Sequence, residues 1–439
     1  MNASALASVF TLNTSAARTR LIGDALWVAV GQGFAAIGLL VGMRLLTEVV
    51  PPRVFGTVAL LLAIATLGYN FLYSPLLSAG TRFYSEAAAS HQLPELRRSL
   101  KRLLLRATFG LILLSLAASM IYSAGRGLSA WMFLALAGLM ALDAARALEV
   151  NLLIAARRQR PAAIWSAAEA WGRPAVAFLA VTTWGVSPER VLAGYAAASA
   201  VCYVVFVLTT PREGIVLAQR QAFSELQLTR DVLHYALPLM PLALVGWVSS
   251  YSDRYVIASI LGVERVGIFA AAVGLVSRPF LMAGTVVGQT LRPLYFSAVT
   301  AGDRGHARRL FRLWLTVTAA ISVAGFGAFV VTGDLIGKLL LAESYRSSLS
   351  LLPGIAVGYG LLALANTLGE RFLAYKRTRT FMLIHAGMAL SYLALSWPLI
   401  RRFGLEGAVI AFALNSLTTV ALLALIGKQI VASRKPEVQ

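Results

Sequence analysis

The chain of 439 residues is 58% hydrophobic and only 13% charged, and its mean hydropathy is +0.74. Soluble domains carry about twice that charged fraction, so the composition excludes an ordinary soluble protein. The net charge is +20, which we attribute to basic cytoplasmic loops of a membrane protein rather than to nucleic-acid binding. The single cysteine, Cys202, excludes an internal disulfide and a cysteine metal site.

Apolar runs of nearly the length of a bilayer span recur from end to end, which predicts an all-α polytopic membrane protein. Residues 1–24 lack the compact apolar core of a cleaved signal peptide and are expected to form a cytoplasmic N-terminal segment. Twelve spans are then predicted, at about 25–47, 54–77, 103–123, 128–155, 162–184, 190–210, 233–261, 266–290, 311–333, 348–369, 381–400 and 404–427. They form an N-terminal six-helix bundle (25–210), a cytoplasmic linker (211–231), a C-terminal six-helix bundle (232–427) and a cytoplasmic tail (428–439).

The distribution of basic residues supports this count of spans. With a cytoplasmic N-terminus, the inside segments hold 26 lysines and arginines and the outside connections hold 8. A missed span would destroy this alternation, because basic residues concentrate in cytoplasmic loops. Both termini are therefore predicted to be cytoplasmic.

An internal repeat relates the two halves. Four arginines recur at an offset of 210 residues, and Gly56 matches Gly267 with a slip of one residue; the four pairs are Arg44/Arg254, Arg82/Arg292, Arg98/Arg308 and Arg102/Arg312. Repeated hydrophobicity with basic loops would imitate some of this pattern, but four coincidences at one offset favour a duplication. Six spans per half give both halves the same orientation, so we expect two parallel repeats around a central cavity.

Several segments resemble the polysaccharide-type flippases of the multidrug/oligosaccharidyl-lipid/polysaccharide (MOP) exporter superfamily. The segments are Arg44-Leu-Leu-Thr, Val54-Phe-Gly-Thr-Val, Ser78-Ala-Gly-Thr-Arg-Phe-Tyr-Ser-Glu, Ser252-Asp-Arg-Tyr-Val-Ile-Ala-Ser-Ile-Leu-Gly, Val266-Gly-Ile-Phe-Ala-Ala-Ala and Phe403-Gly-Leu-Glu-Gly-Ala-Val-Ile-Ala. They follow the family's order over most of the chain. The 48–53 connection, with its two prolines, is longer than the family's pattern.

This resemblance implies flipping of an undecaprenyl-pyrophosphate-linked oligosaccharide from the cytoplasmic to the outer leaflet of the bacterial inner membrane, for surface polysaccharide assembly. It also implies membrane lipids as partners and contact with a polysaccharide polymerase or export machinery. A cavity for such a substrate needs cations for the phosphates, and arginine suits them because its planar fork donates paired hydrogen bonds.

The predicted fourth and fifth spans place charges at matching depths. With about 1.5 Å per residue from the cytoplasmic turn, Glu149 and Glu169 lie about 12 Å deep, and Arg146 and Arg173 lie near the midplane. Asp143 and Arg146 are i,i+3 neighbours, as are Arg146 and Glu149, and Glu169 and Arg173 are an i,i+4 pair. Two interpretations stay open: a polar cavity wall whose carboxylates carry a coupling ion, or a salt-bridge network that locks the two helices together.

The remaining candidates lie in both halves. Arg44 and Arg254 are near the outer ends of their spans and either snorkel or face the cavity; the adjacent Asp253 favours the cavity for Arg254. Arg278 precedes Pro279 within a span, where a proline frees backbone groups, and this favours a cavity role. Arg82 and Arg292 lie at cytoplasmic ends, as solvated anchors or as contacts for an entering pyrophosphate.

Two other classes of protein are weighed against the flippase. A multidrug or cation antiporter of the related fold predicts an acid-lined cavity, whereas the predicted spans hold more arginine than carboxylate. An integral-membrane glycosyltransferase or polymerase normally needs a sizeable outer loop, and every predicted outer connection is short, so no enzyme and no catalytic residue is predicted. The sequence contains no GxxxxGK[ST] motif, so the energy is expected from a proton or sodium gradient or from the substrate's own flux, without a cofactor or bound metal.

Overall fold

The computed structural model describes residues 15–90, 92–123, 130–156, 158–209 and 222–432, and all of its regular elements are helices. Most of the predicted N-terminal segment, about half of the linker and part of the tail lie outside these ranges. The helices are α2 (Ser15–Val49), α3 (Pro52–Gly68), the π-helix η1 (Tyr69–Tyr73), α4 (Ser74–Ala89), α5 (Leu93–Ser123), α6 (Ala130–Ala155), α7 (Gln159–Trp184), α8 (Pro188–Thr209), α9 (Ala222–Ala236), the 3-10 helix η2 (Leu237–Leu239), α10 (Met240–Leu261), α11 (Val263–Thr300), α12 (Arg304–Leu340), the 3-10 helix η3 (Glu343–Leu351), α13 (Leu352–Ala374) and α14 (Thr378–Ala432).

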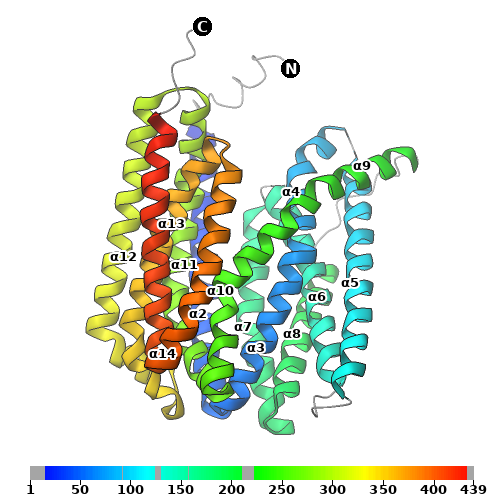
Figure 1. Cartoon of the computed structure of the whole chain (residues 1–439). Coiled ribbons are helices and arrows are strands. Elements are labelled where there is room, and N and C mark those ends of the chain that lie inside the picture. Colours follow the sequence, from blue (N-terminus) through cyan, green and yellow to red (C-terminus); the bar gives the residue numbers. More distant parts are fainter. Residues whose placement is uncertain (1–14, 91, 124–129, 157, 210–221, 433–439) are drawn as a thin grey trace.

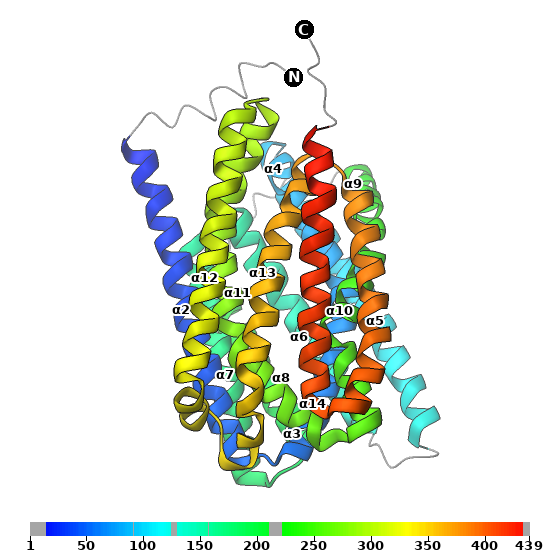
Figure 2. The ribbon, with the colours of Figure 1, turned by 60° about the vertical axis from the view of Figure 1, so that its left-hand side comes forward.

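These helices make twelve passes through one bundle (Figure 1). By length and composition, seven helices of the described residues are able to cross a membrane, and the bent pair α9–α10 makes up to eight. Helix α14 counts twice, because Gly404 has a non-helical backbone with φ of 61° and turns the chain back. Helices α5, α6 and α7 run alongside the others and supply the remaining three of the twelve passes (Figure 2). The predicted class, a twelve-helix polytopic protein, is confirmed.

Several helices differ from their predicted spans for reasons of local chemistry. The second pass widens into a π-helix directly before Pro75, because the proline ring clashes with the carbonyl four residues earlier. The seventh pass bends by 43° between α9 and α10, next to Pro238. Helix α9 packs against α4 and α5 of the first half, while α10 packs against α14. The predicted seventh span, 233–261, thus begins in the last turn of α9 and consists mostly of α10.

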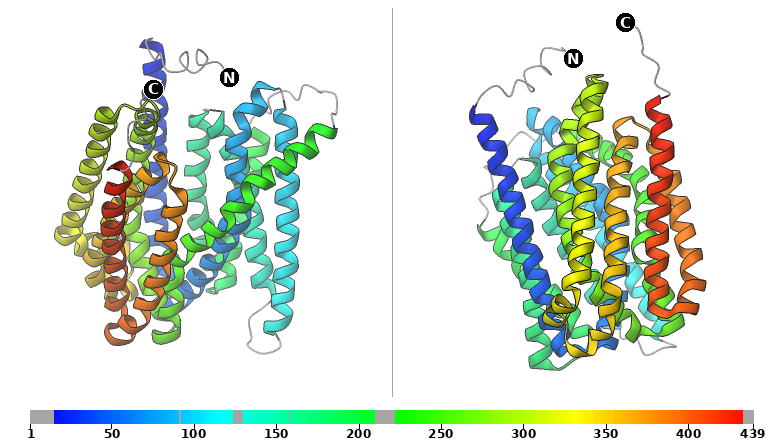
Figure 3. Two further views of the ribbon diagram at one scale, coloured as in Figure 1. Left: turned by 45° about the horizontal axis from the view of Figure 1, so that its top comes forward. Right: turned by 90° about the vertical axis from the view of Figure 1, so that its left-hand side faces the viewer.

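Both described ends of the chain lie on the same side of the bundle. Figure 3 shows the start of α2 and the end of α14 at one end, which we call the basic end. Helices α5 and α12 begin there, each with several arginines in its first turns. The opposite end holds the short connections between α2 and α3 and between α10 and α11.

The two halves meet in a reciprocal crossing of α3 and α11 near the opposite end. A Cβ atom at Gly56 would lie 2.0 Å from the carbonyl oxygen of Val263, and one at Gly267 would lie 2.0 Å from that of Pro52. The two contacts are related by an offset of 211 residues, the same offset that relates the starts of α5 and α12. This pseudo-twofold relation confirms the predicted parallel repeats and the equivalence of the two glycines.

Two hydrogen bonds connect the halves at the end opposite the basic end. The Tyr345 hydroxyl, in η3, donates to the Val50 carbonyl oxygen over 2.6 Å, and the Ala342 N–H donates to Thr47 Oγ1 over 3.3 Å. Tyr345 is fully buried, with its ring edge against Phe55. These contacts join the end of α2 in the first half to the η3 region of the second half.

A Tyr345→Phe variant is expected to be less stable by about 1 to 2 kcal/mol, because the Val50 carbonyl then remains buried without this donor. Thermal unfolding of the purified protein in detergent measures the loss. Tyr235→Phe is the control, since that ring is half-exposed at the basic end. Equal unfolding temperatures for the two variants would contradict a role for Tyr345 in connecting the halves.

Candidate functional site

A cavity of about 460 Å³ lies between the two halves of the bundle. Its walls come from α2, α3, η1, α6, α7 and α8 on one side and from α10 and α11 on the other. Most of the lining is apolar. The polar lining residues are Thr66, Tyr69, Asp143, Arg146, Arg173, Tyr195, Tyr251, Arg254 and Arg278.

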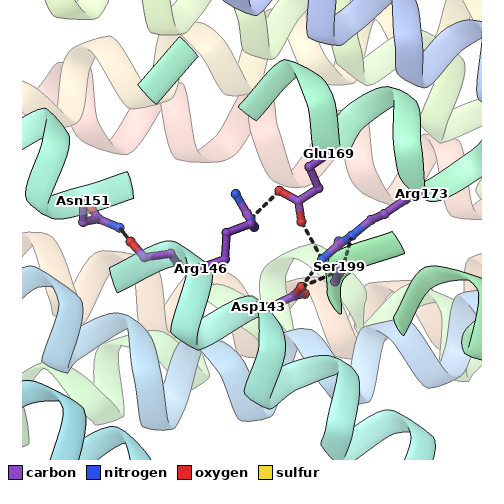
Figure 4. Close-up of polar contacts among 7 residues, drawn as sticks. Asp143, Arg146, Asn151, Glu169, Arg173 and Ser199 are labelled. Carbon is purple, nitrogen blue, oxygen red and sulfur yellow. Dashed lines mark hydrogen bonds and ion pairs between the residues drawn. The ribbon is translucent and has the colours of Figure 1, made fainter. Parts of the chain in front are cut away.

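The wall formed by the first half holds a network of ion pairs (Figure 4). Arg146 of α6 pairs with Glu169 of α7, and Arg173 of α7 pairs with Asp143 of α6. Arg173 also lies 2.6 Å from Glu169, one turn away on its own helix. The network therefore contains two cations and two carboxylates, and its formal charge is zero.

Ser199 of α8 extends this network to a third helix. It accepts a hydrogen bond from Arg173 Nε over 3.1 Å, and its hydroxyl lies 3.3 Å from Asp143 Oδ1. Asp143, Arg146 and Arg173 line the cavity, whereas Glu169 is buried behind them. The ion pairs therefore join α6 to α7, and their arginines face the cavity. A coupling-ion role for the carboxylates stays a prediction.

The wall formed by the second half carries two arginines without carboxylate partners. The Arg254 guanidinium lies over the Tyr251 ring, 4.7 Å from its centroid. Arg278, one turn of α11 beyond Gly274, is exposed to the cavity. Among the described residues, no carboxylate lies within ion-pair distance of either guanidinium.

Asp253 differs from its prediction as a cavity residue. Its carboxylate is buried, with Oδ2 3.1 Å from the Tyr392 hydroxyl of α14 and Oδ1 accepting the backbone N–H of Arg254 over 2.7 Å. Consecutive helical residues point about 100° apart, and here Arg254 lines the cavity while the Asp253 side chain is directed toward α14.

Two predicted candidates form local ion pairs away from the cavity lining. Arg44 lies 2.8 Å from Glu48 near the end of α2, and Arg82 lies 2.8 Å from Glu86 on α4. Both pairs are i,i+4 neighbours whose side chains are partly exposed. Neither residue lines the cavity, which agrees with the snorkelling alternative for Arg44 and the anchor alternative for Arg82.

Two further candidates lie toward the basic end instead. Arg292 pairs with Glu370 of α13, and its side chain is more than half exposed. Glu149 lies 2.6 Å from Arg97 and 3.4 Å from Lys101, both on α5. Neither residue lines the cavity, and Glu149 stands apart from the Asp143–Arg173 network.

Several polar residues of the site, Thr66 among them, were missed in the sequence. Tyr69 and Tyr195 line the cavity, and Ser199 bridges Arg173 and Asp143. Single tyrosines and serines are common in apolar spans, so none of them stood out. The i,i+4 spacing of Tyr195 and Ser199, which places both on one face of α8, was the available signal.

Comparisons with known proteins decide the family. A family model described as "Polysaccharide biosynthesis protein" matches residues 21–299, more than half of the chain. The chain belongs to this family. The match confirms the resemblance noted in the sequence.

A relative and several solved structures are also similar. A Shigella flexneri protein described as an O-antigen transporter is 22% identical over 181 residues, which are 41% of this chain and 42% of that relative. An inward-facing MATE-family multidrug resistance transporter of the MOP superfamily gives a TM-score of 0.74 at 13% identity, over 93% of this chain and 96% of that one. The lipid II flippase MurJ in an inward closed conformation gives a TM-score of 0.68 at 14% identity, over 92% of this chain and 87% of that one. A MOP superfamily transporter from Pyrococcus furiosus gives a TM-score of 0.67 at 13% identity, over 95% of this chain and 96% of that one. Its binding pocket is described as having reverse polarity.

These likenesses establish the MOP fold for the chain. At 13% and 14% identity the solved structures show the fold alone, and the matching family model is described as one of polysaccharide biosynthesis proteins. Among the described residues, no group of three His, Cys, Asp or Glu side chains is placed to hold a metal ion.

Proposed function

We propose that the protein flips an undecaprenyl-pyrophosphate-linked oligosaccharide between the leaflets of the bacterial inner membrane by alternating access. The observation that carries this proposal is the charge of the cavity between the halves. Four arginines and one carboxylate line it, and two of the arginines lack carboxylate partners. Uncompensated cations within a membrane are costly, so they mark a place where an anion binds.

The chemistry of the cavity matches the parts of this substrate. Guanidinium groups bind phosphate oxygens through paired hydrogen bonds, and tyrosine hydroxyls serve sugar hydroxyls. The apolar remainder of the lining suits contact with the part of the lipid tail next to the phosphates. A cationic drug would be repelled by the same arginines, which makes a cation antiporter the less suitable assignment.

The orientation of the protein is part of the proposal. The basic end faces the cytoplasm, since 26 basic residues fall in the segments assigned to that side and 8 in those assigned to the other. Both chain ends are then cytoplasmic, transport runs from the cytoplasmic to the outer leaflet, and a polymerase or export machinery receives the product. The energy comes from an ion gradient or from the flux of the substrate.

Reconstitution into vesicles tests the function directly. A fluorescent polyprenyl-pyrophosphate sugar is loaded symmetrically, and its accessibility to a membrane-impermeant quencher is followed over time. We expect full quenching with the protein and half quenching without it. The Arg254→Gln/Arg278→Gln double variant should resemble empty vesicles, whereas Arg265→Gln, an exposed arginine at the start of α11, should resemble the unchanged protein. Efflux of cationic dyes without lipid movement would instead support an antiporter.

A further inference from the structure

Helix α10 carries three aromatic side chains, Trp247, Tyr251 and Tyr255, each one helical turn from the next. The Trp247 ring is stacked on Tyr251, with 6.4 Å between the ring centroids, and its centroid lies 5.6 Å from that of Tyr255. The Arg254 guanidinium lies 4.7 Å from the centroid of the Tyr251 ring. The three rings, which we call the aromatic group, therefore connect to a side chain that lines the cavity.

Two rings of the aromatic group are hydrogen-bonded to the first half of the protein. Trp247 Nε1 donates to the Ala63 carbonyl oxygen over 2.7 Å, and the Tyr255 hydroxyl donates to the Leu60 carbonyl oxygen over 2.9 Å. Both acceptors are backbone atoms of α3, so their positions do not depend on a side-chain rotamer. The Tyr251 ring therefore packs against a neighbour whose orientation is fixed by the backbone of another helix.

The internal repeat contains a second arginine that has a different fate. Arg44 is the counterpart of Arg254 at the offset of 210 residues, yet it does not line the cavity. It lies 2.8 Å from Glu48, one turn later on α2. The residue at the position of Glu48 in the second half is Ala258, which offers no carboxylate.

The aromatic group is absent from the corresponding positions of α2. At the same offset, the counterparts of the three rings are aliphatic: Ile37 for Trp247, Val41 for Tyr251 and Leu45 for Tyr255. The two halves thus place different partners around one repeated arginine. A carboxylate occupies N–H donors of Arg44, whereas a ring face attracts the Arg254 guanidinium without using those donors.

On the basis of the proposed function, we infer that Trp247, Tyr251 and Tyr255 are positioning residues for Arg254. They direct its guanidinium into the cavity and keep its N–H donors available for an anionic substrate. Tyr251 makes the contact with the guanidinium, and the other two rings hold Tyr251 against α3. This role explains why the cavity uses only one of the two repeated arginines.

Binding of a short-chain polyprenyl pyrophosphate to the full chain in nanodiscs measures this role. Tyr251→Leu should weaken binding by about 3- to 10-fold, because the guanidinium loses its ring contact. Tyr251→Phe keeps a ring and should stay within about 2-fold of the unchanged protein. The Trp247→Phe/Tyr255→Phe variant, which lacks both donors to α3, should lose about 2- to 3-fold.

A matched control is a ring contact of the same kind outside the cavity. The Arg402 guanidinium lies 5.3 Å from the centroid of the Phe403 ring, and neither residue lines the cavity. Phe403→Leu should therefore leave binding of the lipid unchanged. An equal loss in Phe403→Leu and Tyr251→Leu would mean that the effect is general and would overturn the positioning role.

A double-mutant cycle distinguishes positioning from direct contact with the lipid. Arg254→Gln should weaken binding, and Tyr251→Leu should then add no further loss, because Tyr251 acts through the arginine. If Tyr251 touched the lipid itself, its loss would be the same in both backgrounds. That result would overturn the positioning role and leave the proposed function intact.

The repeat supplies a test in the opposite direction. Ala258→Glu gives Arg254 the carboxylate partner that Arg44 has in Glu48, at the same i,i+4 spacing. It should weaken lipid binding by about 3-fold or more, since the new ion pair occupies donors of the guanidinium. Ala258→Gln, which has the same size without the charge, is its control and should cause a smaller loss.

The remaining outcomes separate this inference from the function on which it rests. If Arg254→Gln weakened binding but neither Tyr251→Leu nor Ala258→Glu did, the aromatic group would have no part in positioning the arginine. If Arg254→Gln had no effect, Arg254 would not bind the substrate and would need no positioning. Failure of the unchanged protein to bind the lipid would overturn the proposed function and this role with it.

Discussion

A Gly56→Leu variant is expected to lose about 3 kcal/mol of stability. A Cβ atom at this position would lie 2.0 Å from the Val263 carbonyl oxygen and 2.8 Å from the Gly267 nitrogen. Both atoms belong to the backbone of α11, so no side-chain rotation relieves the clash and the two helices must separate. The separation also weakens the hydrogen bond between Tyr345 and Val50, which lies at the same end.

Thermal unfolding in detergent measures this effect, with Gly284→Leu as the matched control. Gly284 lies on α11, and a Cβ atom there would meet no atom within 4 Å. By the pseudo-twofold relation, Gly267→Leu should be as damaging as Gly56→Leu, since its Cβ would meet the Pro52 carbonyl oxygen at the same distance of 2.0 Å. If Gly56→Leu unfolded at the temperature of Gly284→Leu, the reciprocal crossing would not hold the halves together.

An Arg173→Met variant is expected to lose about 3 to 5 kcal/mol of stability. The substitution leaves Asp143 without its cation and removes one of the two partners of Glu169, which is buried. A carboxylate left unpaired away from water costs more than the original ion pair contributed. By contrast, Arg82→Met should cost less than about 1 kcal/mol, because its pair with Glu86 is exposed.

A double-mutant cycle distinguishes this explanation from a simple loss of packing. Asp143→Leu combined with Arg173→Met removes one cation and one carboxylate and keeps the pair between Arg146 and Glu169. The double variant should therefore be more stable than Arg173→Met alone, with a coupling of about 1 to 3 kcal/mol between the two sites. Additive losses in thermal unfolding would mean that the two side chains act independently.

The fold was predictable because it depends on quantities that a sequence displays directly. The length of each apolar run sets where a helix can span, and the basic residues between runs set the direction of each pass. The bend at η2 was less accessible, because a proline in a membrane helix is compatible with either a kink or a straight span. Pro238 lies at the bend, whereas Pro398 lies within the helical part of α14 that precedes Gly404.

The depth of the site residues in the membrane was predictable, but the direction of their side chains around each helix axis was not. Counting residues from a turn placed Arg146 and Arg173 at one depth, and the structure brings both to one cavity. The same count placed Glu149 and Glu169 at equal depth. However, Asp143 and Glu149 lie six residues apart, which turns their side chains about 120° from each other, so Glu149 meets α5 instead.

The partners of the two second-half arginines also depended on directions that the sequence does not display. The sequence favoured the cavity for Arg254 because Asp253 is adjacent to it, but the helical turn directs the Asp253 carboxylate toward Tyr392. Only the packing of α10 against α14 and α11 determines which of the two faces the cavity. The absence of an ion pair at Arg254 and Arg278, among the residues described, is therefore a finding of the structure.

Photo-crosslinking tests most directly whether the cavity between the halves carries the substrate. A polyprenyl-pyrophosphate sugar with a photoreactive group next to the phosphate is bound to the full chain, irradiated, and the labelled peptides are identified. We predict labelling of α10 and α11 near Tyr251 and Arg278, prevented by excess unlabelled lipid and lost in the Arg254→Gln/Arg278→Gln variant. Labelling confined to bundle-surface residues such as Val323 and Val331 of α12, unaffected by competition, would contradict transport through this cavity.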